Sequence, residues 1–241
     1  MNIGVIFAGG LGTRMHSKDK PKQFLTIFNK PIIIHTIEYF QENENIDAIV
    51  IAIHKDYVDY MGYLVKKYAI TKVKKIVLGG ETGQLSIYSG LRAAKDIVGN
   101  DRAVVLIHDG VRPLINSELL TENIETVKKY GSCITSGVVK ETIVMIDENK
   151  KVELVPSRAH SRVAKAPQSF WLDDILSVQE KAIEKGEKNH IDCCTLMNRY
   201  GYELHMIDGP SENIKITTPD DFFMMRAIFE ARENEQIYIP E

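Results

Sequence analysis

The residues best suited to chemistry follow a short apolar segment near the start of the chain. Residues 3–7 lead directly into the sequence AGGLGTR at residues 8–14. Glycines let a backbone turn sharply and bring its N–H groups against a ligand, and such N–H groups bind phosphates. A phosphate-binding loop is therefore one interpretation, and a tight structural turn is the other.

Two familiar glycine motifs fit this segment poorly. A Walker loop requires Gly-Lys followed by Ser or Thr, which is absent here. The dinucleotide fingerprint requires a third glycine near Met15 and an acid after the second strand, where His54 stands. The sequence thus disfavours an NAD-dependent oxidoreductase.

Two cations lie just beyond the glycine-rich segment. Arg14 ends it, and Lys22 belongs to the sequence PKQF at residues 21–24. Phosphoryl-type transfer depends mostly on positioning and on stabilising charge, which fixed cations can supply. Solvated surface positions are the ordinary alternative for both side chains.

A second polar group follows another apolar run, in the sequence HDGVRP at residues 108–113. Asp109 and Arg112 are expected at the carboxyl end of a strand, where ligands bind in open α/β sheets. Asp109 can orient a substrate hydroxyl or help hold Mg²⁺, whereas the alternative is a turn-forming Asp before Gly. A magnesium ion bridging nucleotide phosphates is expected for such chemistry.

The elements that position these residues alternate along the first half of the chain. Short runs rich in Val and Ile predict buried strands, and the amphipathic segments between them predict helices. The expected strands are residues 3–7, 48–53, 75–78 and 103–107, and the expected helices are residues 32–41, 57–68, 83–96 and 117–130. This order predicts an α/β fold with a mostly parallel sheet and helices on both faces.

The pattern changes after Gly131. Strands are expected at 133–138 and 203–207, a β-hairpin at 142–146 and 152–155, and helices at 172–185, at 192–199 and from Thr218 onward. The sequence therefore predicts one domain over residues 1–241, with a projecting β-hairpin arm at about 140–162.

The composition argues against nucleic acid or a membrane as a partner. Lysine plus arginine number 30 and aspartate plus glutamate number 33, so the net charge of −3 offers no general attraction to nucleic acid or an anionic membrane. The N-terminus has no basic leader, and no apolar stretch reaches the roughly 20 residues that span a bilayer. We expect a cytoplasmic protein with three free thiols, Cys133, Cys193 and Cys194, and no zinc site.

Five motifs in order carry a resemblance to a known family. They are AGGLGTRM, PKQF, HDGVRP, PQSF at residues 167–170, and NIKITTPDD at residues 213–221. Together they resemble the cytidylyltransferases that make CDP-methylerythritol or CDP-ribitol, over nearly the whole chain. The resemblance implies a Rossmann-like nucleotidyltransferase fold, a homodimer with an exchanged β-arm, and Mg²⁺ bound mainly through the CTP phosphates, with no protein ligand to the metal assigned.

The resemblance also implies residue roles. Arg14 and Lys22 stabilise the transition state, and Arg158 and Lys215 position the acceptor phosphate. Residues lining the acceptor pocket are Asp109, Arg112 and Thr142, the last donated with its arm by the other subunit. Residues contacting CTP are Phe7, Ala8, Gly9, Gly10, Gly79, Gly80, Glu81, Thr82, Gly83, Gln84, Leu85, Ser86 and Gly110. Taken alone, Lys215 and Arg158 are ordinary solvated charges.

Departures from the family pattern bear on the substrate. Gly83 stands where relatives carry arginine, and Ala166 and Ile191 stand where threonine is usual. Ala8-Gly9-Gly10 and Ile191-Asp192-Cys193 match the ribitol type better, so the sequence favours ribitol 5-phosphate or a similar pentitol phosphate. The alternatives are 2-C-methyl-D-erythritol 4-phosphate, as in isoprenoid rather than cell-wall or capsule synthesis, and a nucleotide-binding homologue without catalysis.

Overall fold

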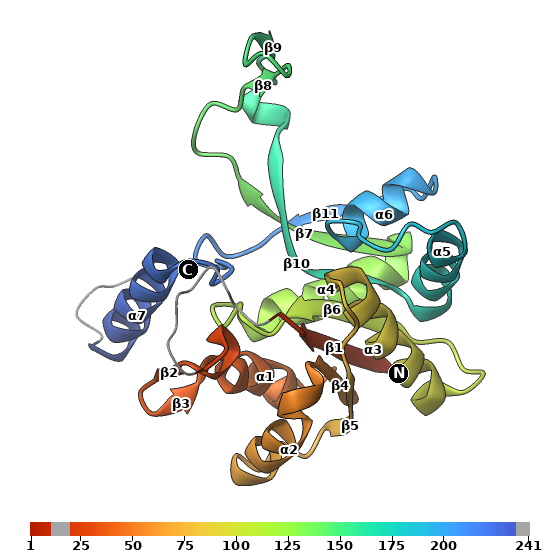
Figure 1. Ribbon diagram of the computed structural model, residues 1–241, viewed down its shortest axis with the longest axis vertical. Coiled ribbons are helices and arrows are strands. Elements are labelled where there is room, and N and C mark those ends of the chain that lie inside the picture. The colour runs from red at the N-terminus through yellow and green to blue at the C-terminus, as the bar shows by residue number, and fades with distance from the viewer. Residues whose placement is uncertain (11–19, 235–241) are drawn as a thin grey trace.

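A seven-stranded sheet in the order β11-β7-β10-β6-β1-β4-β5 forms the centre of the protein. The computed structural model describes residues 1–10 and 20–234 (Figure 1). The strands of this sheet are β1 (Asn2–Ala8), β4 (Ala48–Ile53), β5 (Val73–Leu78), β6 (Val104–Asp109), β7 (Ser132–Val138), β10 (Arg162–Trp171) and β11 (Met206–Asp208). β1 pairs in parallel with β4 and β6, so the carboxyl ends of these strands meet at one edge.

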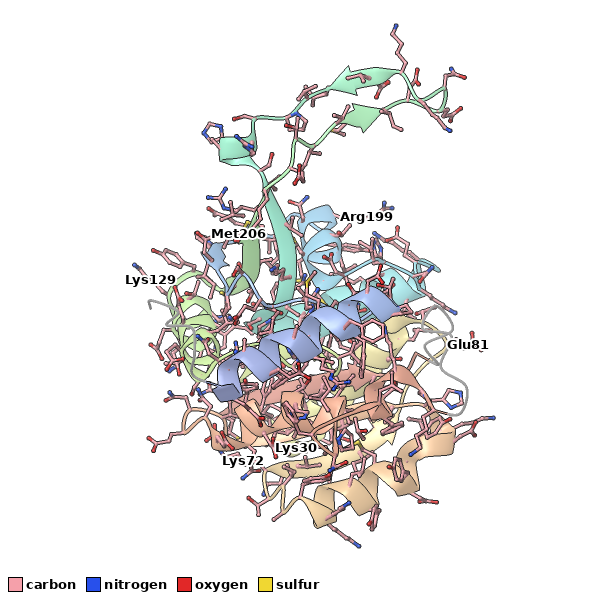
Figure 2. All side chains as sticks on the ribbon, turned by 90° about the vertical axis from the view of Figure 1, so that its left-hand side faces the viewer. Lys30, Lys72, Glu81, Lys129, Arg199 and Met206 are labelled. Atoms are coloured by element: carbon pink, nitrogen blue, oxygen red, sulfur yellow. The ribbon has the colours of Figure 1, made fainter. Side chains whose placement is uncertain are left out.

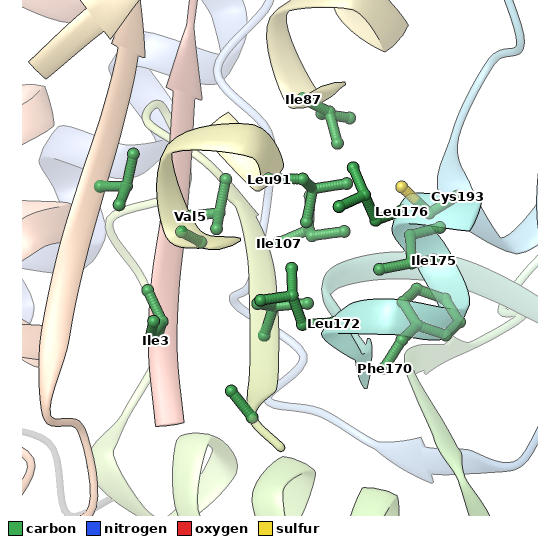
Figure 3. Packing of buried hydrophobic residues seen from close by; sticks show 14 of the residues in the cluster. Ile3, Val5, Ile87, Leu91, Ile107, Phe170, Leu172, Ile175, Leu176 and Cys193 are labelled. Carbon is green, nitrogen blue, oxygen red and sulfur yellow. The ribbon is translucent and has the colours of Figure 1, made fainter. Parts of the chain in front are cut away.

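Helices cover both faces of the sheet, as the alternating sequence pattern predicts. One face carries α1 (Ile32–Glu42), α2 (Val58–Lys67) and α4 (Ser117–Tyr130), whose apolar side chains share one buried cluster. The other face carries α3 (Gly83–Val98), α5 (Leu172–Glu184) and α6 (Cys193–Arg199). Figure 3 shows part of this second cluster, in which Leu91 lies near Val5 of β1 and Ile107 of β6, and Ile175 lies near Phe170 of β10.

Strand β10 is the principal element that the sequence does not predict. It runs antiparallel between β6 and β7, so the sheet is mostly rather than wholly parallel. Its sequence includes Lys165 and Pro167, and a proline argues against a central strand because it cannot donate to the ladder. Here the register shifts between Ala164 and Gln168, so Pro167 lies in the irregular segment where no ladder bond is needed.

The predicted arm is present and stands off the body of the chain (Figures 1 and 2). Its two short strands are β8 (Met145–Ile146) and β9 (Val152–Leu154), which pair antiparallel. Apolar side chains along it are exposed, including Val144, Ile146 and Leu154. A second small hairpin, β2 (Thr26–Ile27) with β3 (Lys30–Pro31), is not predicted by the sequence.

The last helix, α7 (Pro219–Asn234), begins as its sequence predicts. The Asp221 carboxylate accepts hydrogen bonds from the backbone N–H groups of Thr217 and Thr218, and Thr218 Oγ1 accepts one from the Asp221 N–H. These bonds satisfy N–H groups that a helix start leaves unpaired.

The three cysteines are free thiols, as the composition predicts. Cys133 and Cys193 are buried, and Cys194 is half-buried. Within residues 1–10 and 20–234, every helix is too short or too polar to cross a bilayer.

Candidate active site

Two adjoining cavities open at the edge where β1 and β6 end. The first, which we call the glycine-loop cavity, encloses about 300 Å³. It is lined by Ala8, Gly9 and Gly10 of the first glycine-rich segment and by residues of a second one, residues 79–86. The second, the sheet-edge cavity, encloses about 320 Å³ beside β10 and α6. Residues shared by the two linings are Phe7, Gly83, Asp109 and Lys215. These shared residues mark the junction at which groups bound in the two cavities would meet.

Ser86 stabilises the turn of the second glycine-rich segment, residues 79–86, and lies close to Gly9 of the first segment. Its hydroxyl donates to the carbonyl of Thr82 at 2.9 Å and accepts from the Gly80 N–H at 3.1 Å. A Cβ added at Gly9 would lie 2.7 Å from Ser86 Oγ, and one added at Gly80 would lie 2.3 Å from the Leu85 Cβ. Glycine therefore fits at position 9 because the two segments lie close together there, and at position 80 because the second segment packs against itself.

Residues of the PKQF motif contact the start of the first glycine-rich segment, at Ala8 and Gly10. The buried Gln23 amide donates to the carbonyl of Ala8 at 2.9 Å and, more weakly, to that of Gly10 at 3.3 Å. Lys22 lines the glycine-loop cavity, and its ammonium donates to the Ile216 carbonyl at 2.9 Å. The motif thus supplies a cation and also holds the loop in shape, a role for Gln23 that the sequence does not reveal.

An ion triad lies at the junction of the cavities. The Asp109 carboxylate accepts from Lys215 Nζ at 2.6 Å through one oxygen and from Arg112 Nε at 2.8 Å through the other. Burial of Asp109 disfavours its charged form, but the charges and hydrogen bonds of Lys215 and Arg112 outweigh this and lower its pKa to about 2. Asp109 is therefore ionised throughout the neutral range and positions the two cations.

Backbone contacts fix this triad to the sheet. Arg112 also donates to the Asn213 carbonyl at 3.2 Å, and the buried Asn213 amide donates to the Ala166 carbonyl at 2.7 Å. The fully buried His108 precedes Asp109, and its Nε2 lies 3.2 Å from the Arg112 carbonyl oxygen, while its Nδ1 has no hydrogen-bond partner among the described residues. Burial lowers the pKa of His108 to about 4, so the ring is neutral near pH 7.

Amide side chains form another wall of the sheet-edge cavity. Gln168 donates to the Asp192 carboxylate at 3.1 Å and accepts from the Cys194 N–H at 2.9 Å. The buried Gln84 bonds to the Glu187 carbonyl and the His190 N–H, so it holds the loop between α5 and α6 in place. The family resemblance assigns Gln84 to CTP binding. It assigns no role to Gln168, although Gln168 belongs to the PQSF motif.

The structure brings most of the expected site residues together. Those that line a cavity are Phe7, Ala8, Gly9, Gly10, Lys22, Gly80, Glu81, Thr82, Gly83, Gln84, Ser86, Asp109, Arg112 and Lys215. Those that line neither cavity are Gly79, Leu85 and Gly110. Gly79 and Gly110 instead donate backbone hydrogen bonds to Ile53 and Phe7, next to the site.

Three further expected residues lie elsewhere. Arg14 falls outside the described residues. Thr142 and Arg158 are on the exposed arm, where Arg158 donates to the Lys140 carbonyl at 3.3 Å. Neither lines the glycine-loop cavity or the sheet-edge cavity.

The donor set of the site bears on metal binding. Within residues 1–10 and 20–234, no group of three or more His, Cys, Asp or Glu side chains could hold a metal ion. Both oxygens of Asp109, the carboxylate that lines both cavities, already accept from cations. The described residues therefore fit a Mg²⁺ ion held by substrate phosphates better than one held in a protein cage.

Comparisons with known proteins agree with this architecture. The family model described as IspD, 2-C-methyl-D-erythritol 4-phosphate cytidylyltransferase, matches residues 3–231. A ribitol-5-phosphate cytidylyltransferase of Streptococcus agalactiae serotype V is 58% identical over 99% of each chain. A 2-C-methyl-D-erythritol 4-phosphate cytidylyltransferase of Clostridium botulinum is 37% identical over 95% of this chain and 97% of its own.

Solved structures give the same result. The crystal structure of 4-diphosphocytidyl-2C-methyl-D-erythritol synthase from Anaerococcus prevotii superposes with a TM-score of 0.83, at 27% identity, over 95% of this chain and 96% of that one. The family model, the similar sequences and the similar fold thus all indicate the same family. The chain belongs to the IspD family of cytidylyltransferases.

Proposed function

We propose that this protein transfers CMP from CTP to ribitol 5-phosphate, giving CDP-ribitol and pyrophosphate. The observation that carries the proposal is the Lys215–Asp109–Arg112 triad where two cavities meet, one lined by the two glycine-rich segments and one by a mixture of polar and apolar side chains. A nucleotide in the first cavity and a phosphorylated polyol in the second would meet beside Lys215.

The reaction would proceed by direct in-line attack. An oxygen of the acceptor phosphate, anionic near neutral pH, forms a bond to the α-phosphorus of CTP as the bond to pyrophosphate breaks. No general base is required, and Asp109 could not serve as an acid, since its pKa is held at about 2. The triad instead keeps Lys215 and Arg112 in fixed positions, so that they stabilise charge without reorganising.

The glycine-loop cavity would select the nucleotide. Gly9 lies so close to Ser86 that even a methyl group would collide there, which leaves a narrow gap between the two segments. A pyrimidine fits such a space more readily than a purine. Lys22, whose ammonium lies on the same cavity, would face the triphosphate.

Magnesium would enter with the nucleotide. The phosphate oxygens and water would supply its ligands, because the described residues offer no cage of their own. When bound, it would neutralise charge on the leaving pyrophosphate.

The acceptor assignment rests on similarity and on the cavity lining. Relatives named for ribitol 5-phosphate are 51% to 58% identical, whereas Clostridium botulinum relatives named for 2-C-methyl-D-erythritol 4-phosphate are 37% identical. Ala166 and Ile191, two positions at which the chain departs from the family's usual threonine, both line the sheet-edge cavity. The acceptor would therefore meet a different surface there.

The working form would be a homodimer with exchanged arms. Thr142 and Arg158 lie on the arm, away from the cavities of their own chain, and the arm exposes a row of apolar side chains. An exposed apolar row of this kind marks an association surface. A second copy would bury that row and place Thr142 and Arg158 beside the acceptor.

Pyrophosphate release tests the proposal directly. The purified protein is assayed with CTP, UTP, ATP and GTP, each against ribitol 5-phosphate, 2-C-methyl-D-erythritol 4-phosphate, and glycerol, xylitol and mannitol phosphates. We expect turnover with CTP and ribitol 5-phosphate that EDTA abolishes and Mg²⁺ restores. Efficient use of a purine triphosphate would overturn the nucleotide assignment, and preference for another acceptor would overturn the ribitol assignment.

A further inference from the structure

Lys165, on β10, is a cation of the sheet-edge cavity that no family motif accounts for. Its side chain lies across Gly137 of β7: a Cβ added at Gly137 would lie 2.6 Å from Lys165 Cε and 3.1 Å from Nζ. The bare backbone of Gly137 therefore gives the lysine stem room to lie flat along the cavity wall. Its ammonium reaches the Ser211 carbonyl only at 3.4 Å, a long hydrogen bond.

The electrostatic surroundings of Lys165 are positive. Partial burial lowers the pKa of Lys165, and the positive charges of Arg112 and Lys140 lower it further. Within residues 1–10 and 20–234, no carboxylate forms an ion pair with Lys165, although thirteen other ion pairs are present.

The carboxylates of the cavity are already engaged. Asp109 accepts from Arg112 and Lys215, and Asp192 accepts from Gln168 and from the Thr195 N–H that begins α6. Three cations thus line the cavity against two committed carboxylates. A partly buried ammonium among other cations is costly unless an anion joins it, so the arrangement favours an anionic ligand over a neutral one.

We propose that Lys165 binds the phosphate group of the acceptor, which it shares with Arg112 and Lys215. This inference rests on the proposed function, since it names a further residue for the same acceptor site. A phosphate dianion would supply the negative charge that the cavity lacks, and an ammonium binds phosphate as a point charge. The hydroxyl groups of the polyol would then form hydrogen bonds with the amide side chains of the cavity, such as Gln168.

Three variants separate charge from packing. Lys165→Met keeps an unbranched apolar stem over Gly137 and removes the charge, whereas Lys165→Arg keeps the charge. Lys181→Met, on the exposed surface of α5, is the matched control because it lines neither cavity. Each is compared with wild type by steady-state kinetics in CTP and in ribitol 5-phosphate.

We expect Lys165→Met to raise the KM for ribitol 5-phosphate by about tenfold or more, the effect of losing one charged hydrogen bond. The KM for CTP stays within twofold, Lys165→Arg restores most of the acceptor affinity, and Lys181→Met behaves as wild type. The inference is overturned if Lys165→Met leaves the acceptor KM within twofold of wild type, or raises the two KM values equally.

A binding experiment keeps this inference separate from the proposed function. If wild type does not turn over ribitol 5-phosphate, the proposed function fails, and calorimetric titration of inorganic phosphate into wild type and Lys165→Met then decides the role of Lys165. Binding weakened about tenfold by Lys165→Met supports a phosphate contact. Equal binding overturns it.

Discussion

At the scale of single residues, the charge and position of each side chain in the site are set by the side chains that it contacts. Asp109 is kept ionised by Lys215 and Arg112, and the same contacts fix the two cations at the cavity junction. The position of HDGVRP after a strand, and the resemblance carried by NIKITTPDD, predict a site containing these three residues, and the structure places them in contact. Their hydrogen bonds, and the supporting contacts of Gln23 and Asn213, depend on segments that meet only in the folded chain.

Lys22 is predicted to act on the transition state. Replacing Lys22 by Ala should lower turnover by about a hundredfold or more, as loss of one oxyanion-stabilising group does, with a smaller effect on CTP binding. The comparison is kcat against CTP affinity by calorimetry, with Lys66→Ala on the exposed face of α2 as control. A folded Lys22→Ala protein with near-normal kcat would remove Lys22 from the catalytic set.

His108 is predicted to make stability depend on acid pH. Its pKa is about 4 in the folded protein against an ordinary 6.5, so its contribution is complete above pH 6.5 and is lost as the pH falls toward 4. The full loss amounts to about 3 kcal/mol of unfolding free energy.

Urea unfolding at pH 7.5, 6 and 5 measures this dependence. His108→Gln should flatten it relative to wild type, while His160→Gln, at an exposed position on the arm, should not. Parallel slopes for His108→Gln and wild type would show that His108 is not the group responsible.

At the scale of elements, the sequence predicts the alternating half of the fold well and the second half less completely. Residues 48–53 and 117–130 coincide with β4 and α4, because continuous Val and Ile runs and capped amphipathic segments are local signals. β10 was missed because its pairing with β6 and β7 is decided by tertiary contacts, while Lys165 and Pro167 disguise its local pattern. Two of the cavity-lining residues that the sequence did not reveal, Lys165 and Gln168, lie on that strand.

Replacing two helical glycines by alanine is predicted to change the free energy of unfolding in opposite directions. In α3, a Cβ at Gly90 would lie 2.6 Å from Val5 Cγ1 of β1, so Gly90→Ala should destabilise the protein by about 1–3 kcal/mol through overpacking. In α2, nothing lies within 4 Å of such an atom at Gly62, so Gly62→Ala should stabilise by up to about 1 kcal/mol. Chemical denaturation of both variants measures the difference. A stabilising Gly90→Ala would show that α3 and β1 do not pack this closely.

At the scale of the whole molecule, the arm stands out because its residues line neither of the two cavities in the same chain. The sequence predicted a hairpin there from its polar turn, and the resemblance, not the composition, implied that it is exchanged. The structure shows the hairpin standing off the body with exposed apolar side chains. No local signal in one sequence specifies what covers these side chains, so arm exchange stays a prediction.

Arm exchange predicts complementation between two defective proteins. Lys215→Ala removes a cavity residue and Arg158→Ala an arm residue, so each homodimer should be nearly inactive. After the two are unfolded and refolded together, half of the randomly paired dimers are mixed, and one of their two sites combines an intact cavity with an intact arm. Recovery of about a quarter of wild-type turnover is expected on that arithmetic. No recovery in verified mixed dimers would mean that each arm serves its own chain.

Competition between the two acceptors tests the central claim most directly. Wild-type protein is given CTP and Mg²⁺ with equal concentrations of ribitol 5-phosphate and 2-C-methyl-D-erythritol 4-phosphate, and the nucleotide products are identified by mass spectrometry at early times. We predict that CDP-ribitol dominates and that pyrophosphate forms in equal amount. Predominance of the methylerythritol product, or CTP left unchanged, would contradict the account.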